Sequence, residues 1–212
     1  AQLLQEYPGV YMHTHLSENQ DEIAWVQALF PEASSYTDVY HQAGLTGKRS
    51  VFAHGIHLSD AECDCLAQTQ SSIAHCPTSN QFLGSGAINL AQLEQYKIKL
   101  GLGTDIGGGT SFSMLRTMAS AYEVQQSRGH ALNPFKALYL ATLGGAKVLD
   151  LEGVVGNFAL GCEADFIVLD PLATPLLALR HQHIKTLLEQ LFVLNTLGDD
   201  RCIAATYSFG RL

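Results

Sequence analysis

Short runs of apolar residues alternate with longer segments of mixed polarity along roughly the first 130 residues. The apolar runs are rich in β-forming residues and end in polar loops, which is typical of strands that are buried on both faces. In the mixed segments the apolar residues recur every three or four positions, which predicts helices. Strands are expected over residues 9–15, 50–55, 72–76 and 98–105, and helices over residues 19–30, 36–44, 58–68, 89–96 and 114–127.

Strands that alternate with helices in this way indicate parallel βα units, and four of them are expected here. A further helix is predicted over residues 133–151, opened by Pro134 and loosened at Gly144 and Gly145. Two short strands around a turn at Gly161 are expected next. They are followed by helices over residues 174–182 and 184–192 and by a final strand over residues 202–210. The change of character after residue 150 is the only plausible domain boundary.

Composition narrows the class of protein. Of the 212 residues, 47% are hydrophobic and 15% are charged, which indicates a packed globular protein and excludes disorder. The formal net charge is -8, with only 12 Lys and Arg and no basic cluster along the chain, so nucleic acid and acidic membranes are not expected as partners. Neither a run of about 18 apolar residues nor a signal peptide is visible, so a soluble, cytoplasmic protein is expected.

Each strand of the four βα units ends on or near a residue that can bind a metal or move a proton. These residues are His15, His54, His75 and Asp105. The carboxyl ends of parallel strands converge on one face, where α/β proteins build their active sites. Residues that are far apart in the sequence, such as His15 and Asp105, are therefore expected to meet in space.

Histidine nitrogen and aspartate oxygen are suitable ligands for Zn²⁺, and a catalytic zinc keeps one position open for water, which becomes a nucleophile there. Glu18, just past His15, is placed to carry a proton from that water to a leaving group. His13 is interpreted as a structural residue one layer deeper on the same strand face. His75 is left open between a ligand and a residue that packs or hydrogen-bonds beneath the site. His57 is expected to be solvated.

The glycine-rich segment 101–109 is compared with phosphate-binding loops. It lacks the lysine of a P-loop and the ordered G-x-G-x-x-G that opens a helix. Its glycines are interpreted as letting the backbone pass close to a bound substrate.

Seven motifs follow one another along the chain: HTHLSEN, FAHG, SIAHCPTSN, GLGTDIGGGTSFSML, LATLGGAKVLDL, GNFALGCEADFIVLDP and LGDDR. Together they resemble the guanine deaminases of the amidohydrolase superfamily, and the bacterial members most closely. HLSE or GTD alone is a superfamily motif, whereas the full series is specific. The resemblance implies a (β/α)8 barrel and the zinc-dependent hydrolytic deamination of guanine to xanthine and ammonia in purine catabolism.

Residue by residue, the resemblance implies that His15 and Asp105 are zinc ligands from the fifth and eighth barrel strands. Glu18 would relay protons to the purine ring and to the departing amine. His54, from the sixth strand, would orient or polarise the zinc-bound hydroxide, and Asp105 would also accept a proton from the water. His15, Glu18 and Asp105 would contact the substrate. The cytidine deaminase pattern H-x-E with P-C-x-x-C is absent, which excludes that route to the same reaction type.

The chain departs from the family in one respect. Guanine deaminases carry an H-x-H pair on the first barrel strand that supplies two further zinc ligands, and no such strand precedes the four βα units here. A complete (β/α)8 barrel takes about 250 residues. The chain is therefore expected to hold the second half of the barrel and the following helix in residues 1–153. Helices and part of a small β-sandwich are expected in residues 154–212. Catalysis is expected only of a full-length protein, and weak zinc binding of this chain alone.

Two alternatives stay open. One is another amidohydrolase that acts on a different aminated heterocycle or on a chlorinated triazine. The other is a catalytically inert module that self-associates, because the first and last strands of a half-barrel have open edges that soluble proteins cover or pair. The expected partners are guanine and, in a homo-oligomer, a second copy of the chain.

Overall fold

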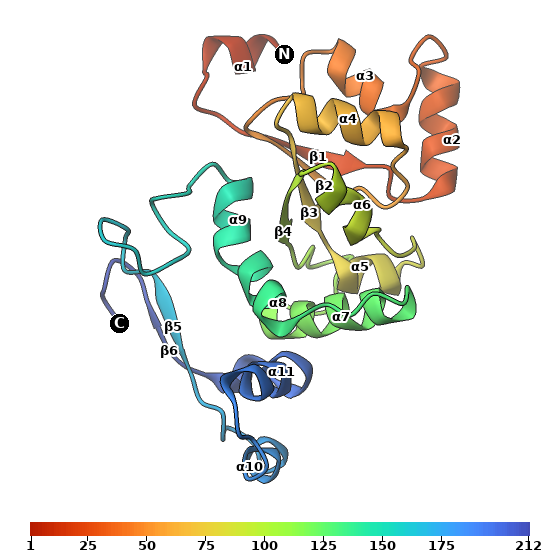
Figure 1. Ribbon diagram of the computed structural model, residues 1–212. Coiled ribbons are helices and arrows are strands. Elements are labelled where there is room, and N and C mark those ends of the chain that lie inside the picture. The colour runs from red at the N-terminus through yellow and green to blue at the C-terminus, as the bar shows by residue number, and fades with distance from the viewer.

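The computed structural model describes residues 1–212 and contains two separate sheets (Figure 1). The larger sheet has four parallel strands in the order β1-β2-β3-β4. Their bounds are β1 Met12–Leu16, β2 Ser50–His54, β3 Ser72–His75 and β4 Lys99–Leu102. Each strand overlaps the segment predicted for it, so the four parallel βα units are confirmed.

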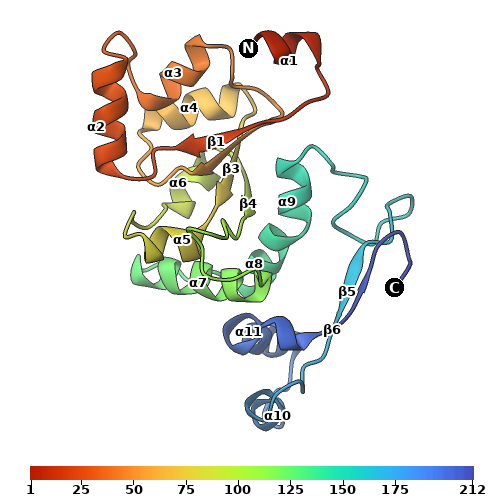
Figure 2. The same cartoon turned by 180° about the vertical axis from the view of Figure 1, so that it is seen from behind.

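Helices connect the parallel strands and lie against the sheet. In Figures 1 and 2, α3 and α4 lie beside β1 and β2, whereas α8 and α9 lie beside β4 at the other edge. The pattern of apolar residues did not predict α1 or α5. None of the helices is long and apolar enough to cross a membrane. The helices up to residue 127 are α1 Gln2–Glu6, α2 Gln20–Leu29, α3 Tyr36–Gln42, α4 Asp60–Gln68, α5 Pro77–Phe82, α6 Leu90–Gln95 and α7 Met114–Ser127.

A capping box begins α4 and also joins it to α3. The Ser59 hydroxyl accepts a hydrogen bond from the backbone N–H of Glu62 at 3.3 Å, and the Glu62 carboxylate accepts one from the backbone N–H of Ser59 at 2.9 Å. The other carboxylate oxygen of Glu62 accepts a hydrogen bond from the Thr37 hydroxyl at 3.1 Å. Glu62 is buried, yet both of its oxygens are hydrogen-bonded, so its burial is compensated.

The core lies between the larger sheet and its helices. Phe52 pairs in register with Ile73, and Ile73 with Leu100, so the three side chains form one buried row across β2, β3 and β4. Leu177 and Val193, from the carboxyl-terminal helices, belong to the same core. Those helices therefore pack against the parallel sheet and its helices through a continuous apolar interior.

The helix predicted over residues 133–151 is divided at Thr142 into α8 Pro134–Ala141 and α9 Leu143–Val148. A Cβ on Gly144 would lie 3.0 Å from the carbonyl oxygen of Leu100, and a Cβ on Gly101 would lie 3.0 Å from the Cα of Gly145. The glycines thus allow the backbone of α9 to approach the backbone of β4. The sequence predicts that these glycines loosen the helix; in the structure they allow a close contact between the helix and the strand.

The smaller sheet pairs β5 Phe166–Leu169 antiparallel with β6 Ile203–Tyr207, and α10 Pro175–His181, α11 Leu187–Leu197 and the 3-10 turn Asp200–Cys202 lie between them in the chain. The prediction of a strand on each side of Gly161 is wrong, because only the second one forms. Before Gly161 the chain turns instead. The Asn157 side chain accepts a hydrogen bond from the backbone N–H of Ala159, and the N–H of Cys162 donates to the Ala159 carbonyl.

Candidate active site

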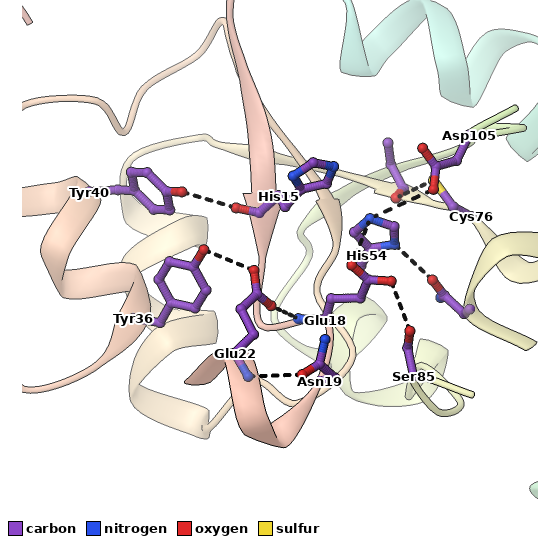
Figure 3. Close-up of polar contacts among 12 residues, drawn as sticks. His15, Glu18, Asn19, Glu22, Tyr36, Tyr40, His54, Cys76, Ser85 and Asp105 are labelled. Carbon is purple, nitrogen blue, oxygen red and sulfur yellow. Dashed lines mark hydrogen bonds and ion pairs between the residues drawn. The ribbon is translucent and has the colours of Figure 1, made fainter. Parts of the chain in front are cut away.

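The carboxyl ends of the parallel strands bring together three of the predicted site residues. His15 lies near the end of β1, His54 ends β2, and Asp105 follows β4 (Figure 3). The rings of His15 and His54 are stacked, with centroids 5.3 Å apart and an interplanar angle of 23°. The Nε2 atom of His54 lies 3.9 Å from Oδ2 of Asp105. The convergence expected from parallel topology is therefore present.

Glu18 joins this cluster from the loop after β1. Its Oε2 atom lies 3.6 Å from Nε2 of His54, and its Oε1 atom accepts a hydrogen bond from the Ser85 hydroxyl at 2.8 Å. The backbone N–H of Glu18 donates to the Glu22 carboxylate at 2.9 Å, and the hydroxyl of Tyr36 donates to the other oxygen of Glu22 at 3.0 Å. Both the carboxylate and the backbone of Glu18 are therefore held in place (Figure 3).

His54 is almost fully buried, with 1% of the residue exposed. Its Nδ1 atom lies 2.8 Å from the side-chain oxygen of Asn80, which only accepts hydrogen bonds, so Nδ1 carries the proton and donates. Nε2 has no hydrogen-bond partner and faces the carboxylates of Glu18 and Asp105. Nε2 is thus the nitrogen that is available to a ligand or a reacting atom.

The backbone at the strand ends is strained. Ser17, His54 and Asp105 have φ values of 47°, 72° and 48°, in the left-handed region that side chains other than glycine rarely adopt. At the first two, the strain is supported by neighbouring hydrogen bonds. The N–H of Gly55 donates to the Leu16 carbonyl, and the N–H groups of residues 56 and 57 donate to the Ser17 carbonyl. Strain of this kind gathers at functional sites, where it aims side chains that a regular strand would point elsewhere.

His75 lies beneath the cluster and is fully buried. Neither of its ring nitrogens has a hydrogen-bond partner. Burial, and to a lesser extent the neighbouring His54, lowers the pKa of His75 from 6.5 to about 3. Of the alternatives left open by the sequence, the structure favours an uncharged residue that packs under the site.

Cys76 is a second buried group beside the cluster. Burial, reinforced by the negative charge of Asp105, raises the pKa of the Cys76 thiol to about 12. A thiol with such a pKa is protonated at neutral pH and is a poor nucleophile. The chemistry of the site therefore belongs to the imidazole and carboxylate groups.

Two interpretations of the remaining histidines were wrong. His13 is exposed and is not a deeper core residue. The face of β1 that lies against α3 is the opposite one, where Thr14 meets Tyr40. His57 is half-buried, and its Nε2 atom hydrogen-bonds the carbonyl oxygen of Ser85 at 3.0 Å. His57 thus holds the loop that contains Ser85, and the hydroxyl of Ser85 contacts Glu18.

Sequence reasoning assigned no role to Asn80, Ser85 or Glu22. Asn80 lies inside the motif SIAHCPTSN, three residues after Pro77 at the start of α5, so a buried polar residue near a strand end was the available signal. Ser85 lies between two glycines with positive φ, Gly84 and Gly86, in a loop that no pattern linked to Glu18. Only the structure shows that the Ser85 hydroxyl hydrogen-bonds Glu18.

The cluster by itself does not hold a metal ion. No three His, Cys, Asp or Glu side chains in residues 1–212 are arranged to hold a metal ion by themselves. The donor types fit zinc nonetheless, because His15 offers a nitrogen and Asp105 an oxygen at the carboxyl ends of β1 and β4, and both lie beside His54. The unpartnered Nε2 atom of His54 beside two carboxylates also marks a place where further polar atoms are needed.

Comparison with known proteins identifies the class. The Amidohydrolase family matches the chain over residues 1–212, so the chain belongs to this family and has its α/β fold. The particular relatives are guanine deaminases. That of Escherichia coli (strain K12) is 57% identical over 210 residues, which cover 99% of this chain and 48% of the relative. That of Homo sapiens is 37% identical over 213 residues, which cover 95% of this chain and 46% of the relative.

Two of the solved structures that this chain resembles are also guanine deaminases. The guanine deaminase of E. coli superimposes with a TM-score of 0.98 at 56% identity, covering 100% of this chain and 49% of that one. The guanine deaminase of C. acetobutylicum, solved with guanine bound in its active site, gives a TM-score of 0.87 at 32% identity and covers 99% of this chain and 50% of that one. The chain spans about half the length of the curated relatives it matches.

Proposed function

We propose that this chain carries part of the active site of a guanine deaminase, which hydrolyses guanine to xanthine and ammonia in purine catabolism. The observation that carries the proposal is the placement of the Glu18 and Asp105 carboxylates on either side of Nε2 of His54 at the strand ends. Replacing an amino group on a purine ring needs a nucleophilic oxygen, a base to deprotonate it and an acid to protonate the ring and the amine. The cluster contains groups suited to the acid and base tasks, and water is the source of the oxygen.

Asp105 accepts a proton from the attacking water. Glu18 donates its proton to the ring nitrogen as the C–O bond forms, then accepts the proton left on the new oxygen and donates it to the amino group, so that the C–N bond breaks and neutral ammonia leaves. The proton held by Asp105 then returns to Glu18 for the next turnover. His54 is held by the hydrogen bond from Nδ1 to Asn80, and its Nε2 atom, which faces Glu18 and Asp105, orients or polarises the reacting oxygen. His15, Glu18 and Asp105 line the place where the substrate binds.

We infer that the metal of this site is zinc and that His15 and Asp105 hold it. A bound zinc lowers the pKa of water to near neutrality and acts as a Lewis acid. Catalytic zinc has about three protein ligands, so the remaining ones are proposed to lie outside residues 1–212. The unpartnered Nε2 atom of His54 supports this placement, because a polar group beside it compensates its burial.

The wider organisation is proposed on the same basis. Residues 1–153 form the second half of a (β/α)8 barrel with its following helix, and residues 154–212 contribute helices and part of a small β-sandwich. The separation of the β5–β6 pair from the parallel sheet supports a boundary between these parts. A cytoplasmic homo-oligomer that binds a small-molecule substrate is proposed for the whole protein.

The proposal is tested with a protein that contains this sequence at the full length of its relatives. Guanine, adenine, cytosine and S-adenosylhomocysteine are offered separately, and ammonia release is measured. We expect release from guanine at a rate at least a hundred times that from the other amines. Turnover of another amine in preference to guanine would contradict the substrate, and turnover of none would support an inert module.

Removal of the Ser85 hydroxyl tests how Glu18 is held. In Ser85→Ala, the hydrogen bond to Oε1 of Glu18 is lost, and a hydrogen bond to a charged group contributes on the order of 1.5–3 kcal/mol. We expect kcat for guanine in the full-length protein to fall roughly tenfold, with KM changed less than threefold. Ser127→Ala is the matched control, because that hydroxyl bonds a helix carbonyl in α7. Equal kcat values for the two variants would show that Ser85 does not position Glu18.

A further inference from the structure

A cavity of about 450 Å³ lies beside the start of β4, at the end of this strand opposite to the candidate active site. Lys99 begins β4 and lines this cavity, whereas Asp105 lies beyond the other end of the same strand. The walls come from α6, the start of β4, α8 and α9, and Figure 1 shows α8 and α9 beside β4. The size falls within the range of cavities that bind small molecules.

Four of the six lysines of this acidic protein line the cavity, namely Lys97, Lys99, Lys136 and Lys147. Lys136 pairs with Glu94 at 2.9 Å, and Lys147 pairs with Glu152 at 3.1 Å. Lys97 and Lys99 form no ion pair. Two positive charges are therefore left uncompensated in a chain with a formal net charge of -8.

Two of the ammonium groups lie near the ring of Tyr139 of α8. The Nζ atoms of Lys136 and Lys147 lie 5.3 and 5.9 Å from the centroid of its ring. A cation–π contact stabilises each ammonium, yet two like charges near one ring repel each other. Glu94 and Glu152 already compensate these two charges, so the uncompensated charge of the cavity is that of Lys97 and Lys99.

We propose that this cavity binds a small molecule that carries a di- or triphosphate group. Lysine ammonium groups bind phosphate as point charges without a fixed planar geometry, and several around one cavity match an anion with several charges. A single carboxylate would neutralise only one of the two uncompensated lysines. The lysines are separated by up to 50 positions in the sequence, which is why the linear pattern contained no basic cluster.

The site is tested by calorimetric titration of the chain with inorganic tripolyphosphate and, separately, with a nucleoside triphosphate. We expect both to bind, with at least tenfold weaker affinity in the double variant Lys97→Gln/Lys99→Gln. Tighter binding of the nucleoside triphosphate than of tripolyphosphate would identify a nucleotide as the ligand, and equal binding a phosphate chain alone. The control Lys48→Gln/Lys185→Gln changes the net charge by the same amount away from the cavity.

Lys97→Arg/Lys99→Arg preserves both charges and is expected to bind within threefold of the original chain, which separates loss of charge from loss of fold. Failure of tripolyphosphate and the nucleoside triphosphate to bind the original chain would overturn the proposal. Equal weakening in the control double variant would overturn it as well, because the effect would then reflect net charge. Equally tight, lysine-dependent binding of a polyglutamate peptide would assign the cavity to an acidic polypeptide instead.

Discussion

Replacing Glu18 with glutamine is expected to lower kcat for guanine by about 10²- to 10⁴-fold in a protein of the relatives' full length, which is the usual contribution of a positioned acid–base group. Glutamine has nearly the same shape, and its amide oxygen still accepts the hydrogen bond from Ser85. It cannot release or take up a proton at neutral pH. The loss therefore falls on proton delivery, and KM is expected to change less than fivefold.

Steady-state kinetics of ammonia release check this prediction, with circular dichroism as evidence that the variant is folded. Glu6→Gln is the control, because Glu6 lies in α1 and its side chain accepts a hydrogen bond only from the Gln2 side chain. A folded Glu18→Gln protein that retains more than a tenth of the original kcat would exclude Glu18 as the proton carrier. A rise in KM with unchanged kcat would instead assign Glu18 to substrate binding alone.

The parallel sheet could be predicted from sequence because each of its strands is marked by a short apolar run of neighbouring residues. Runs such as residues 50–55 are apolar on both strand faces, and this requires both faces of the sheet to be covered. Parallel topology then places His15, His54 and Asp105 at one edge without any knowledge of distances. The strand ends were therefore predictable, and the contact distances agree with that expectation.

The supporting residues could not be predicted, because their partners are distant in sequence. Ser85 meets Glu18 across 67 positions and Asn80 meets His54 across 26, and neither pair has a periodic signature. The exposure of His13 has a similar origin. Alternation along β1 shows which residues share a face but not whether that face is covered, which depends on elements elsewhere.

The pairing of β5 with β6 was missed for a related reason. Two β-forming runs flank Gly161, and adjacent runs most often form a hairpin. A local hydrogen bond that the Asn157 side chain accepts from the backbone N–H of Ala159 closes the first run into a turn, and Phe166 stacks on Tyr207 with ring centroids 4.6 Å apart. A contact with the far end of the chain therefore outweighs the nearer partner.

His75 is expected to make the chain markedly less stable in acid. Its pKa is about 3 in the folded protein against 6.5 ordinarily, so below pH 6.5 the unfolded chain takes up a proton that the folded chain does not. The stability that this residue contributes is thus present above pH 6.5 and is lost as the pH falls toward 3. The free energy of unfolding should decrease by about 1.4 kcal/mol for each pH unit in this window.

His75→Leu isolates this effect from the titration of carboxylates. Leucine has a similar volume, and no hydrogen bond is lost because both ring nitrogens of His75 lack partners. Urea unfolding at pH 7.5 should give free energies within about 1.5 kcal/mol of each other for the two chains. Between pH 6.5 and 4.5 the original chain should lose roughly 2 kcal/mol more than the variant. His130→Leu, at an exposed position, should leave the pH dependence unchanged, and a parallel decline for all three chains would mean that His75 is charged in the folded state.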